Sequence, residues 1–145
     1  MATPDELEAL LVDRGHLKAV LDLDLTLPGS VLAFQFETGT TIAWVDSSDT
    51  AQLADMAVAG RDDPSMKRPL ELLGSGDTNG VVGLTEQSSW SQLVGNYVAW
   101  AWTLTNHQGF EDGVQLEFVE TSTMKSTILQ LMAEGGRFSI RFLDL

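Results

Sequence analysis

Residues 17–27 read Leu-Lys-Ala-Val-Leu-Asp-Leu-Asp-Leu-Thr-Leu, and this stretch decides the fold. Leucine or alanine recurs at every second position, a period of two that is typical of a β-strand with one face buried. The pattern predicts a strand that places its leucines on one face and its two acids, Asp22 and Asp24, in water on the other. Pro28-Gly29 follows and predicts a tight turn.

The same alternation recurs along the chain and predicts further strands joined by turns. These strands are expected at residues 31–37, 41–46, 98–104, 114–118, 123–132 and 138–142. Gly135-Gly136 suits a two-residue hairpin loop, because both residues can adopt positive φ. Strands with one face exposed to solvent alternate apolar and polar residues, whereas buried parallel strands are continuously apolar. The pattern therefore favours an antiparallel meander.

Helical signals are fewer. Thr3 suits the N-cap of a helix over Pro4–Arg14, and residues 88–93 predict a second short helix. Residues 51–59 fit either a strand or a short helix, and residues 60–80 read as a long loop. We therefore expect an α+β fold, in which an antiparallel meander packs against one or two short helices within a single domain over residues 1–145.

The chain is strongly acidic, with 21 Asp and Glu against 8 Lys and Arg and a formal net charge of -13. Such a chain repels nucleic-acid phosphates and anionic lipid, and it attracts basic proteins. It has no cysteine, which excludes disulfides and thiolate metal sites, and its first residues lack a signal-peptide pattern. We expect a cytoplasmic protein with a basic protein partner, no cofactor, and no direct contact with nucleic acid or membrane.

These features favour a non-catalytic binding protein, such as an inhibitor of a basic protein. Its contacts are expected to come from acids in the turns and in the long loop. The candidate binding residues are Asp46, Asp49, Asp62, Asp63, Asp77, Glu111 and Asp112, with Asp22 and Asp24 as further candidates on the first strand.

An enzymatic alternative comes from the segment Asp22-Leu23-Asp24-Leu25-Thr26. It resembles the first motif of the haloacid dehalogenase superfamily of phosphotransferases, in which an apolar strand ends in Asp-x-Asp-x-Thr. The resemblance implies that Asp22 attacks phosphorus, that Asp24 is the general acid or base, and that Asp77 helps to hold Mg²⁺. The chain, however, shows strands joined by turns where that fold needs strand–helix–strand units.

The most distinctive segment begins at two tryptophans, Trp100 and Trp102, which share one face of a predicted strand and are expected to anchor the core. A recognition surface is the alternative use of these tryptophans. A tryptophan-bearing strand followed by an Asn-x-x-Gly-aromatic-x-Asp turn, here Asn106 to Asp112, resembles small uncharacterised bacterial proteins of the domain-of-unknown-function type. The resemblance covers the last third of the chain. It implies a small α+β bacterial protein, some of whose relatives act as immunity-type partners of toxins.

Self-association is a third hypothesis. An edge strand over residues 138–144 can pair with a second copy of the chain across a two-fold axis and form a homodimer.

Overall fold

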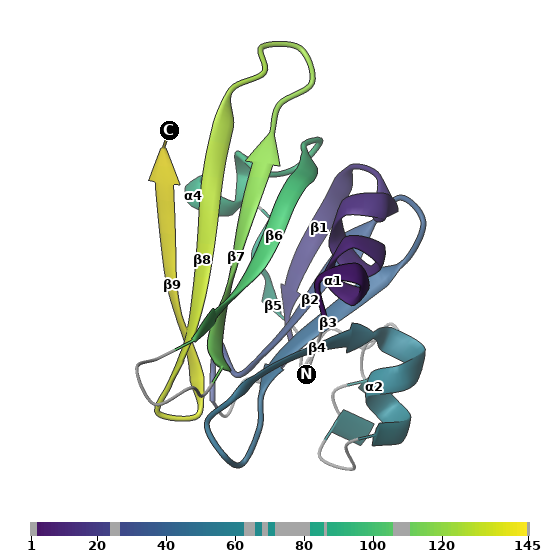
Figure 1. Cartoon of the computed structure of the whole chain (residues 1–145), viewed down its shortest axis with the longest axis vertical. Helices are drawn as coiled ribbons and strands as arrows, with labels where there is room; N and C mark the ends of the chain where they lie inside the picture. Colours follow the sequence, from purple (N-terminus) through teal and green to yellow (C-terminus); the bar gives the residue numbers. More distant parts are fainter. Residues whose placement is uncertain are drawn as a thin grey trace.

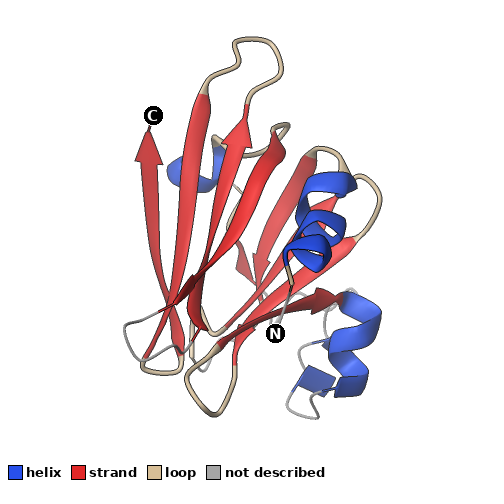
Figure 2. Cartoon of the chain, viewed as in Figure 1, coloured by secondary structure: helices blue, strands red, loops and turns tan. Residues whose placement is uncertain are grey.

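A computed structural model describes residues 3–23, 27–62, 66–67, 70–71, 82–85, 87–105 and 111–144. Strands dominate the described part of the chain, and its helices are short (Figure 2). The elements in chain order are α1 (Pro4–Leu11), the short 3-10 helix η1 (Val12–Arg14), β1 (Leu17–Asp22), β2 (Val31–Phe36), β3 (Thr40–Val45), β4 (Ala51–Asp55), α2 (Met56–Asp62), β5 (Val82–Gly83), α4 (Ser88–Ser91), β6 (Tyr97–Thr105), β7 (Glu111–Val119), β8 (Ser126–Glu134) and β9 (Arg137–Asp144).

The strands form two antiparallel sheets (Figure 1). One sheet has the order β4-β3-β2-β1-β5, and the other has the order β6-β7-β8-β9. Within each sheet, strands that follow each other in the chain mostly pair with each other, which confirms the antiparallel pairing that the alternation predicts. Helix α1 contacts both β4 and β6 and so bridges the two sheets along one side.

The expected α+β fold class is wrong, because the protein is mainly β. The α1 helix has 8 residues and α4 only 4, whereas β6, β7 and β8 have 9 residues each. None of the helices in the described residues has the length and apolarity that crossing a bilayer requires. The sequence shows that each sheet has an apolar face, but not that the second sheet, rather than helices, covers it.

One hydrophobic cluster fills the space between the sheets. Phe34 and Leu32 contribute from the five-stranded sheet, Leu116 and Phe118 contribute from the four-stranded sheet, and Leu11 closes the side of the cluster from α1. All five side chains have no exposed surface. At about 25 cal/mol per Å² of apolar surface removed from water, burial of this kind is the main force holding the two sheets together.

A second cluster lies on the opposite face of the five-stranded sheet. Ala33 and Ile42 of this sheet pack there with Ala59 of α2 and with Met66. The five-stranded sheet is therefore buried on both faces, which explains why β2 reads as a nearly continuous apolar run. Residues 51–59, for which the sequence allows either a strand or a short helix, contain parts of both. β4 ends at Asp55, and α2 starts at the next residue.

A β-bulge in β1 changes the side of the sheet to which Asp22 points, so the expectation that this acid lies in water is wrong. Leu17 pairs with Phe36, and Ala19 pairs with Gln35, the residue next to Phe36 in β2. Lys18 is therefore an extra residue of β1 that has no counterpart in β2. The extra residue reverses the side to which all following side chains point. As a result Asp22, which was expected in water, is only 7% exposed. Asp24 lies outside the described residues.

A second bulge, in β6, moves two tryptophans out of the core. Val98 pairs with Phe118, but Trp100 pairs with Glu117, so Ala99 is the extra residue. Val98 points inward, and beyond the bulge the inward positions pass to Ala101 and Thr103. The expectation that Trp100 and Trp102 anchor the core is therefore wrong, and their side chains are 67% and 38% exposed.

Local signals at the two ends of the chain are confirmed. The Thr3 hydroxyl accepts a hydrogen bond from the Glu6 N–H at 3.2 Å and caps α1. Gly135 and Gly136 both have positive φ in the turn between β8 and β9. The helix expected over residues 88–93 exists as α4, although its N-cap is Gln87 and no side chain caps it.

Candidate functional site

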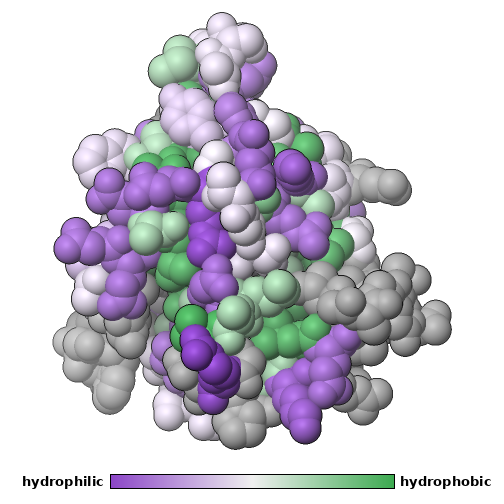
Figure 3. Space-filling view, turned by 90° about the vertical axis from the view of Figure 1, so that its right-hand side faces the viewer, coloured by the Kyte–Doolittle hydropathy of each residue, from purple (hydrophilic) through white to green (hydrophobic). Residues whose placement is uncertain are grey.

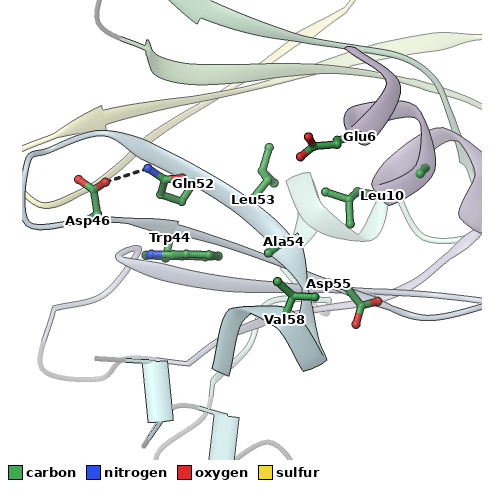
Figure 4. Close-up of a pocket in the computed structure, with 10 residues that line it drawn as sticks. Glu6, Leu10, Trp44, Asp46, Gln52, Leu53, Ala54, Asp55 and Val58 are labelled. Carbon is green, nitrogen blue, oxygen red and sulfur yellow. Dashed lines mark hydrogen bonds between the residues drawn. The ribbon is translucent and has the colours of Figure 1, made fainter. Parts of the chain in front are cut away.

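An open groove of about 520 Å³ follows β4, the edge strand of the five-stranded sheet (Figure 4). Its walls come from α1, from the end of β3, from β4 itself and from α2. The lining residues are Glu6, Ala9, Leu10, Trp44, Asp46, Gln52, Leu53, Ala54, Asp55 and Val58.

The groove wraps around the outer edge of β4. Leu53 and Ala54 are neighbours in a strand, so their side chains point to opposite faces of the sheet. Leu53 packs toward the core between the sheets, and Ala54 packs toward the cluster under α2. Leu10 and Val58 stand on the two sides of the strand (Figure 4). An occupant would therefore lie beside the strand and not on one of its faces.

The backbone of β4 presents hydrogen-bonding groups to this groove. Val45 N–H donates to Ser30 O at 3.1 Å on the β2 side, whereas Asp46 N–H donates to Thr50 O at 3.0 Å on the β4 side. Alternate residues of an antiparallel strand bond to opposite neighbours, and Leu53 pairs with Ala43, two residues before Val45. The N–H and C=O of Leu53 therefore point away from β3, and among the described residues they have no hydrogen-bond partner.

Three carboxylates border the groove, from Glu6, Asp46 and Asp55, and no Lys or Arg is among the described residues that line it. Seen from this side of the molecule, hydrophilic side chains surround smaller hydrophobic patches (Figure 3). An apolar floor with an acidic border is complementary to a segment that carries both apolar and basic side chains.

Asp55 is held in place by a partly buried ion pair. Its Oδ2 atom lies 2.6 Å from Nη2 of Arg14, and its Oδ1 atom accepts a hydrogen bond from Ala57 N–H at 3.0 Å, which caps the start of α2. The hydrogen bond from Arg14, followed by that from Ala57, lowers the pKa of Asp55. Asp55 is therefore charged at neutral pH, and it ties β4 to η1 and α2.

Asp46 organises the turn that closes one end of the groove. Its carboxylate accepts hydrogen bonds from the N–H groups of Ser48 at 2.9 Å and Thr50 at 3.1 Å, and from Nε2 of Gln52 at 2.8 Å. An Asp that bonds the backbone two residues ahead stabilises a turn. Of the acids predicted to bind a partner, Asp46 is the one that lines the groove, and its charge remains in the groove wall.

Two other predicted acids are used inside the fold. The Asp22 carboxylate accepts a buried hydrogen bond from Gly29 N–H at 2.9 Å. Asp49 accepts hydrogen bonds from Gly135 N–H at 3.3 Å and Gly136 N–H at 2.9 Å, which joins the β3–β4 turn to the β8–β9 turn. Both acids hold turns in place.

The remaining predicted acids are not brought together. Asp112 in β7 is half-buried, and its Oδ1 atom has no hydrogen-bond partner among the described residues. Asp62 and Glu111 belong to α2 and β7, and their side chains are not described. Asp24, Asp63 and Asp77 lie outside the described residues, as does most of the expected loop over residues 60–80.

The surroundings of Asp22 differ from those that the phosphotransferase resemblance implies. That motif belongs to a strand within strand–helix–strand units, where neighbouring strands are parallel. Here β1 pairs antiparallel with β2 on one side and with β5 on the other. Among the described residues, no three His, Asp or Glu side chains gather as a metal-ion site.

Sequence reasoning missed the groove because its parts are distant in the chain. Glu6 comes from the first helix and Asp55 from the fourth strand, and the ion pair of Asp55 with Arg14 spans 41 positions. The one local signal is Asp55 itself, an acid at the junction of a strand and a helix, which is the position that an N-cap occupies.

The fold and the groove define a class: a mainly β protein of two antiparallel sheets with an acidic groove at one sheet edge. The chain belongs to the family described as Family of unknown function (DUF6334), which matches residues 31–144. The resemblance to an uncharacterised family, expected from the last third of the chain, thus holds over most of its length. Neither a curated protein nor a solved structure matches the chain.

Proposed function

We propose that this protein is a non-catalytic binding protein whose β4 groove receives an extended, basic segment of a partner protein. The observation that carries the proposal is the outward-facing backbone of Leu53, which lies in a groove bordered by three carboxylates. Within this proposal, the protein acts in a bacterial cytoplasm as an inhibitor or immunity-type partner of a basic protein.

Strand addition is the binding mode that suits this geometry. An extended peptide that lies beside an edge strand forms main-chain hydrogen bonds with it, while its alternate side chains enter the spaces on the two faces. Beside β4 these spaces are bounded by Leu10 on one side and by Val58 on the other. Main-chain hydrogen bonds between the peptide and Leu53 supply affinity, and the carboxylates of Glu6 and Asp46 supply the preference for basic side chains.

The whole-chain charge supports the same partner. A net charge of -13 speeds the encounter with a basic protein, and this effect weakens as salt screens the charges. The proposal therefore predicts two separate contributions to affinity. One comes from the carboxylates and weakens with salt, and the other comes from hydrogen bonds between β4 and the backbone of the peptide.

Calorimetric titration with a blocked eight-residue peptide of alternating lysine and valine tests the proposal. We expect saturable binding that weakens as salt rises from 50 to 500 mM, settings chosen because screening lengths shrink from over 10 Å to a few Å across roughly this range. A matched peptide with serine in place of lysine is expected to bind more weakly. Equal binding of the two peptides, or no binding of either, would contradict the proposal.

A matched pair of variants separates the groove from general electrostatics. Glu6→Gln removes a charge that lines the groove, and Asp13→Asn removes an exposed charge nearby that does not line it. Glu6→Gln should weaken peptide binding about two- to five-fold, the usual effect of a partly exposed charge pair, and Asp13→Asn should change it less. Equal losses would mean that the peptide senses only the net charge.

The phosphohydrolase hypothesis stays a separate alternative with its own assay. The proposal expects no hydrolysis of p-nitrophenyl phosphate with Mg²⁺. Hydrolysis that disappears in Asp22→Asn, in a variant that still folds, would favour the enzyme instead.

A further inference from the structure

The most exposed large apolar side chain in the described part of the protein is Trp100. It is 67% exposed, although tryptophan is on average a highly buried residue. The bulge at Ala99 turns it outward, so its exposure follows from the pairing of β6 with β7. Removing this side chain from water would release free energy, and a partner that covers it would gain that energy.

Trp100 borders a cleft of about 280 Å³ between α1 and β6. The lining residues are Pro4, Asp5, Glu8, Val12, Ala99, Trp100 and Ala101. Asp5 and Glu8 are exposed acids on the same side of α1, and no Lys or Arg is among the described residues of the lining. An indole ring and two carboxylates thus share one small cleft.

This cleft is distinct from the β4 groove. Asp5 and Glu8 are three residues apart and lie on one side of α1, and Val12 follows at the start of η1. Glu6, Ala9 and Leu10 form the side of α1 that lines the β4 groove. Glu8 lies beyond the first turn of the helix, where the helix dipole gives no reason for an acid.

The chemistry of the cleft selects a flat cation. The face of an indole ring attracts a cation, and arginine makes this contact more often than lysine because its planar guanidinium stacks on the ring. The edge of a guanidinium donates hydrogen bonds to carboxylates. An arginine that stacks on Trp100 can present its edge to Asp5 or Glu8.

We propose that the cleft between α1 and β6 binds an arginine side chain of a basic protein partner, in a contact separate from the β4 groove. A partner that crosses α1 would engage the groove with an extended segment and the cleft with this arginine. The cleft binds arginine whether or not the groove takes a strand, so the two proposals can fail independently.

Titration with Nα-acetyl-arginine amide, followed by ¹H–¹⁵N NMR, tests the cleft. The chain has 4 tryptophans, and each gives one indole N–H signal, which single Trp→Phe variants assign. We expect the Trp100 indole and the Glu8 amide to shift saturably. The lysine analogue should bind more weakly and the norleucine analogue should give no saturable shift.

Trp100→Ala should weaken binding about two- to five-fold, as for an exposed cation–π contact, and Glu8→Gln should weaken it by a similar factor. Trp102→Ala removes a neighbouring exposed tryptophan that does not line the cleft, and it should leave binding unchanged. Because Trp100 lies at the surface, Trp100→Phe tests the ring without disturbing the fold. Binding to Trp100→Ala that is as tight as binding to the original protein would overturn the proposal. Equal responses to arginine and norleucine, or no response of the Trp100 indole in the original protein, would also overturn it. Shifts confined to the Leu53 amide would overturn the cleft and leave the groove standing.

Discussion

At the scale of single residues, the acids of this chain divide into two uses. Asp22 and Asp49 use their carboxylates to hold turns, and Glu6 borders the groove. Asp46 and Asp55 do both, because each accepts backbone hydrogen bonds and also lines the groove. A high acid count therefore does not identify binding residues, because a carboxylate beside free backbone N–H groups is drawn into the fold. The distinction depends on neighbours in space, which spacing along the chain does not reveal.

Asp49 is predicted to be the most important of the turn acids. It holds a positive φ of 58, which is unfavourable for residues other than glycine and asparagine-like ones, and its carboxylate joins the two sheets. Asp49→Ala should lower the free energy of unfolding by about 1–2 kcal/mol, Asp49→Gly by less because it relieves the φ, and Asp49→Asn least. Urea midpoints give the order. An Asp49→Ala variant that is as stable as the original protein would contradict the stabilising role of Asp49.

Asp55 is predicted to set part of the acid limit of stability. Its pKa is lower in the folded protein than the unfolded value of ~3.9, so its pairing with Arg14 stabilises the fold above that value and stops doing so as pH falls through the folded-state pKa. Asp55→Asn keeps an N-cap for α2 but loses the ion pair. We expect a loss of no more than about 1 kcal/mol at pH 7, because the carboxylate is partly exposed.

The matching pH profile is the informative measurement. Below about pH 4 the stability of Asp55→Asn should fall less steeply than that of the original protein, whereas Asp13→Asn, which leaves the ion pair intact, should keep the original slope. Identical slopes for Asp55→Asn and the original protein in urea unfolding at pH 2–5 would contradict this assignment, since carboxylates titrate within that range.

At the scale of elements, the sequence predicts the positions of the strands well, but it predicts poorly which side of the sheet each side chain faces. Alternation located β1, β2, β3 and the four C-terminal strands, and Gly135-Gly136 located a hairpin turn. The bulges at the start of β1 and at Ala99 shift the alternation by one residue, and each reverses a face. A bulge depends on how the partner strand pairs, so the misplacement of Asp22 and Trp100 follows from information that one strand does not contain.

The close pairing of β7 and β8 gives an element-scale prediction. A Cβ atom on Gly113 would lie 2.5 Å from Sδ of Met132 and 2.6 Å from the backbone oxygen of Leu131. Gly113→Ala should therefore cost about 1–3 kcal/mol, as overpacking usually does. Gly83→Ala in β5, where the nearest atom would be 4.0 Å away, should stay within about 0.5 kcal/mol. Thermal unfolding of the two variants compares them, and equal stability would contradict the close approach.

At the scale of the whole molecule, charge and edges act against each other. β9 is the outer strand of the four-stranded sheet, where a second copy could pair, but two copies that each carry a net charge of -13 repel. Low salt should therefore favour the monomer, and salt should promote any dimer through β9, the reverse of its effect on a basic peptide. Light scattering at low and high salt measures the oligomeric state, and a dimer that dissociates as salt rises would contradict this prediction.

Closure of the two sheets is also a property of the whole molecule. One wall of the acidic groove comes from α1, which packs beside β4. No periodicity in the sequence predicts that a helix from the first residues lies beside the fourth strand. The composition predicts a basic partner, whereas the proposed place of contact depends on the three-dimensional arrangement.

Hydrogen exchange at the Leu53 amide tests the central claim most directly. In the free protein this N–H faces the groove without a partner among the described residues, so it should exchange quickly for a residue in a strand. Saturation with the lysine–valine peptide should slow its exchange at least about tenfold, since a hydrogen-bonded amide must open before it exchanges, and a peptide N-methylated at alternate residues should not. A Leu53 amide whose exchange is unchanged by a saturating, bound peptide would contradict strand addition at β4.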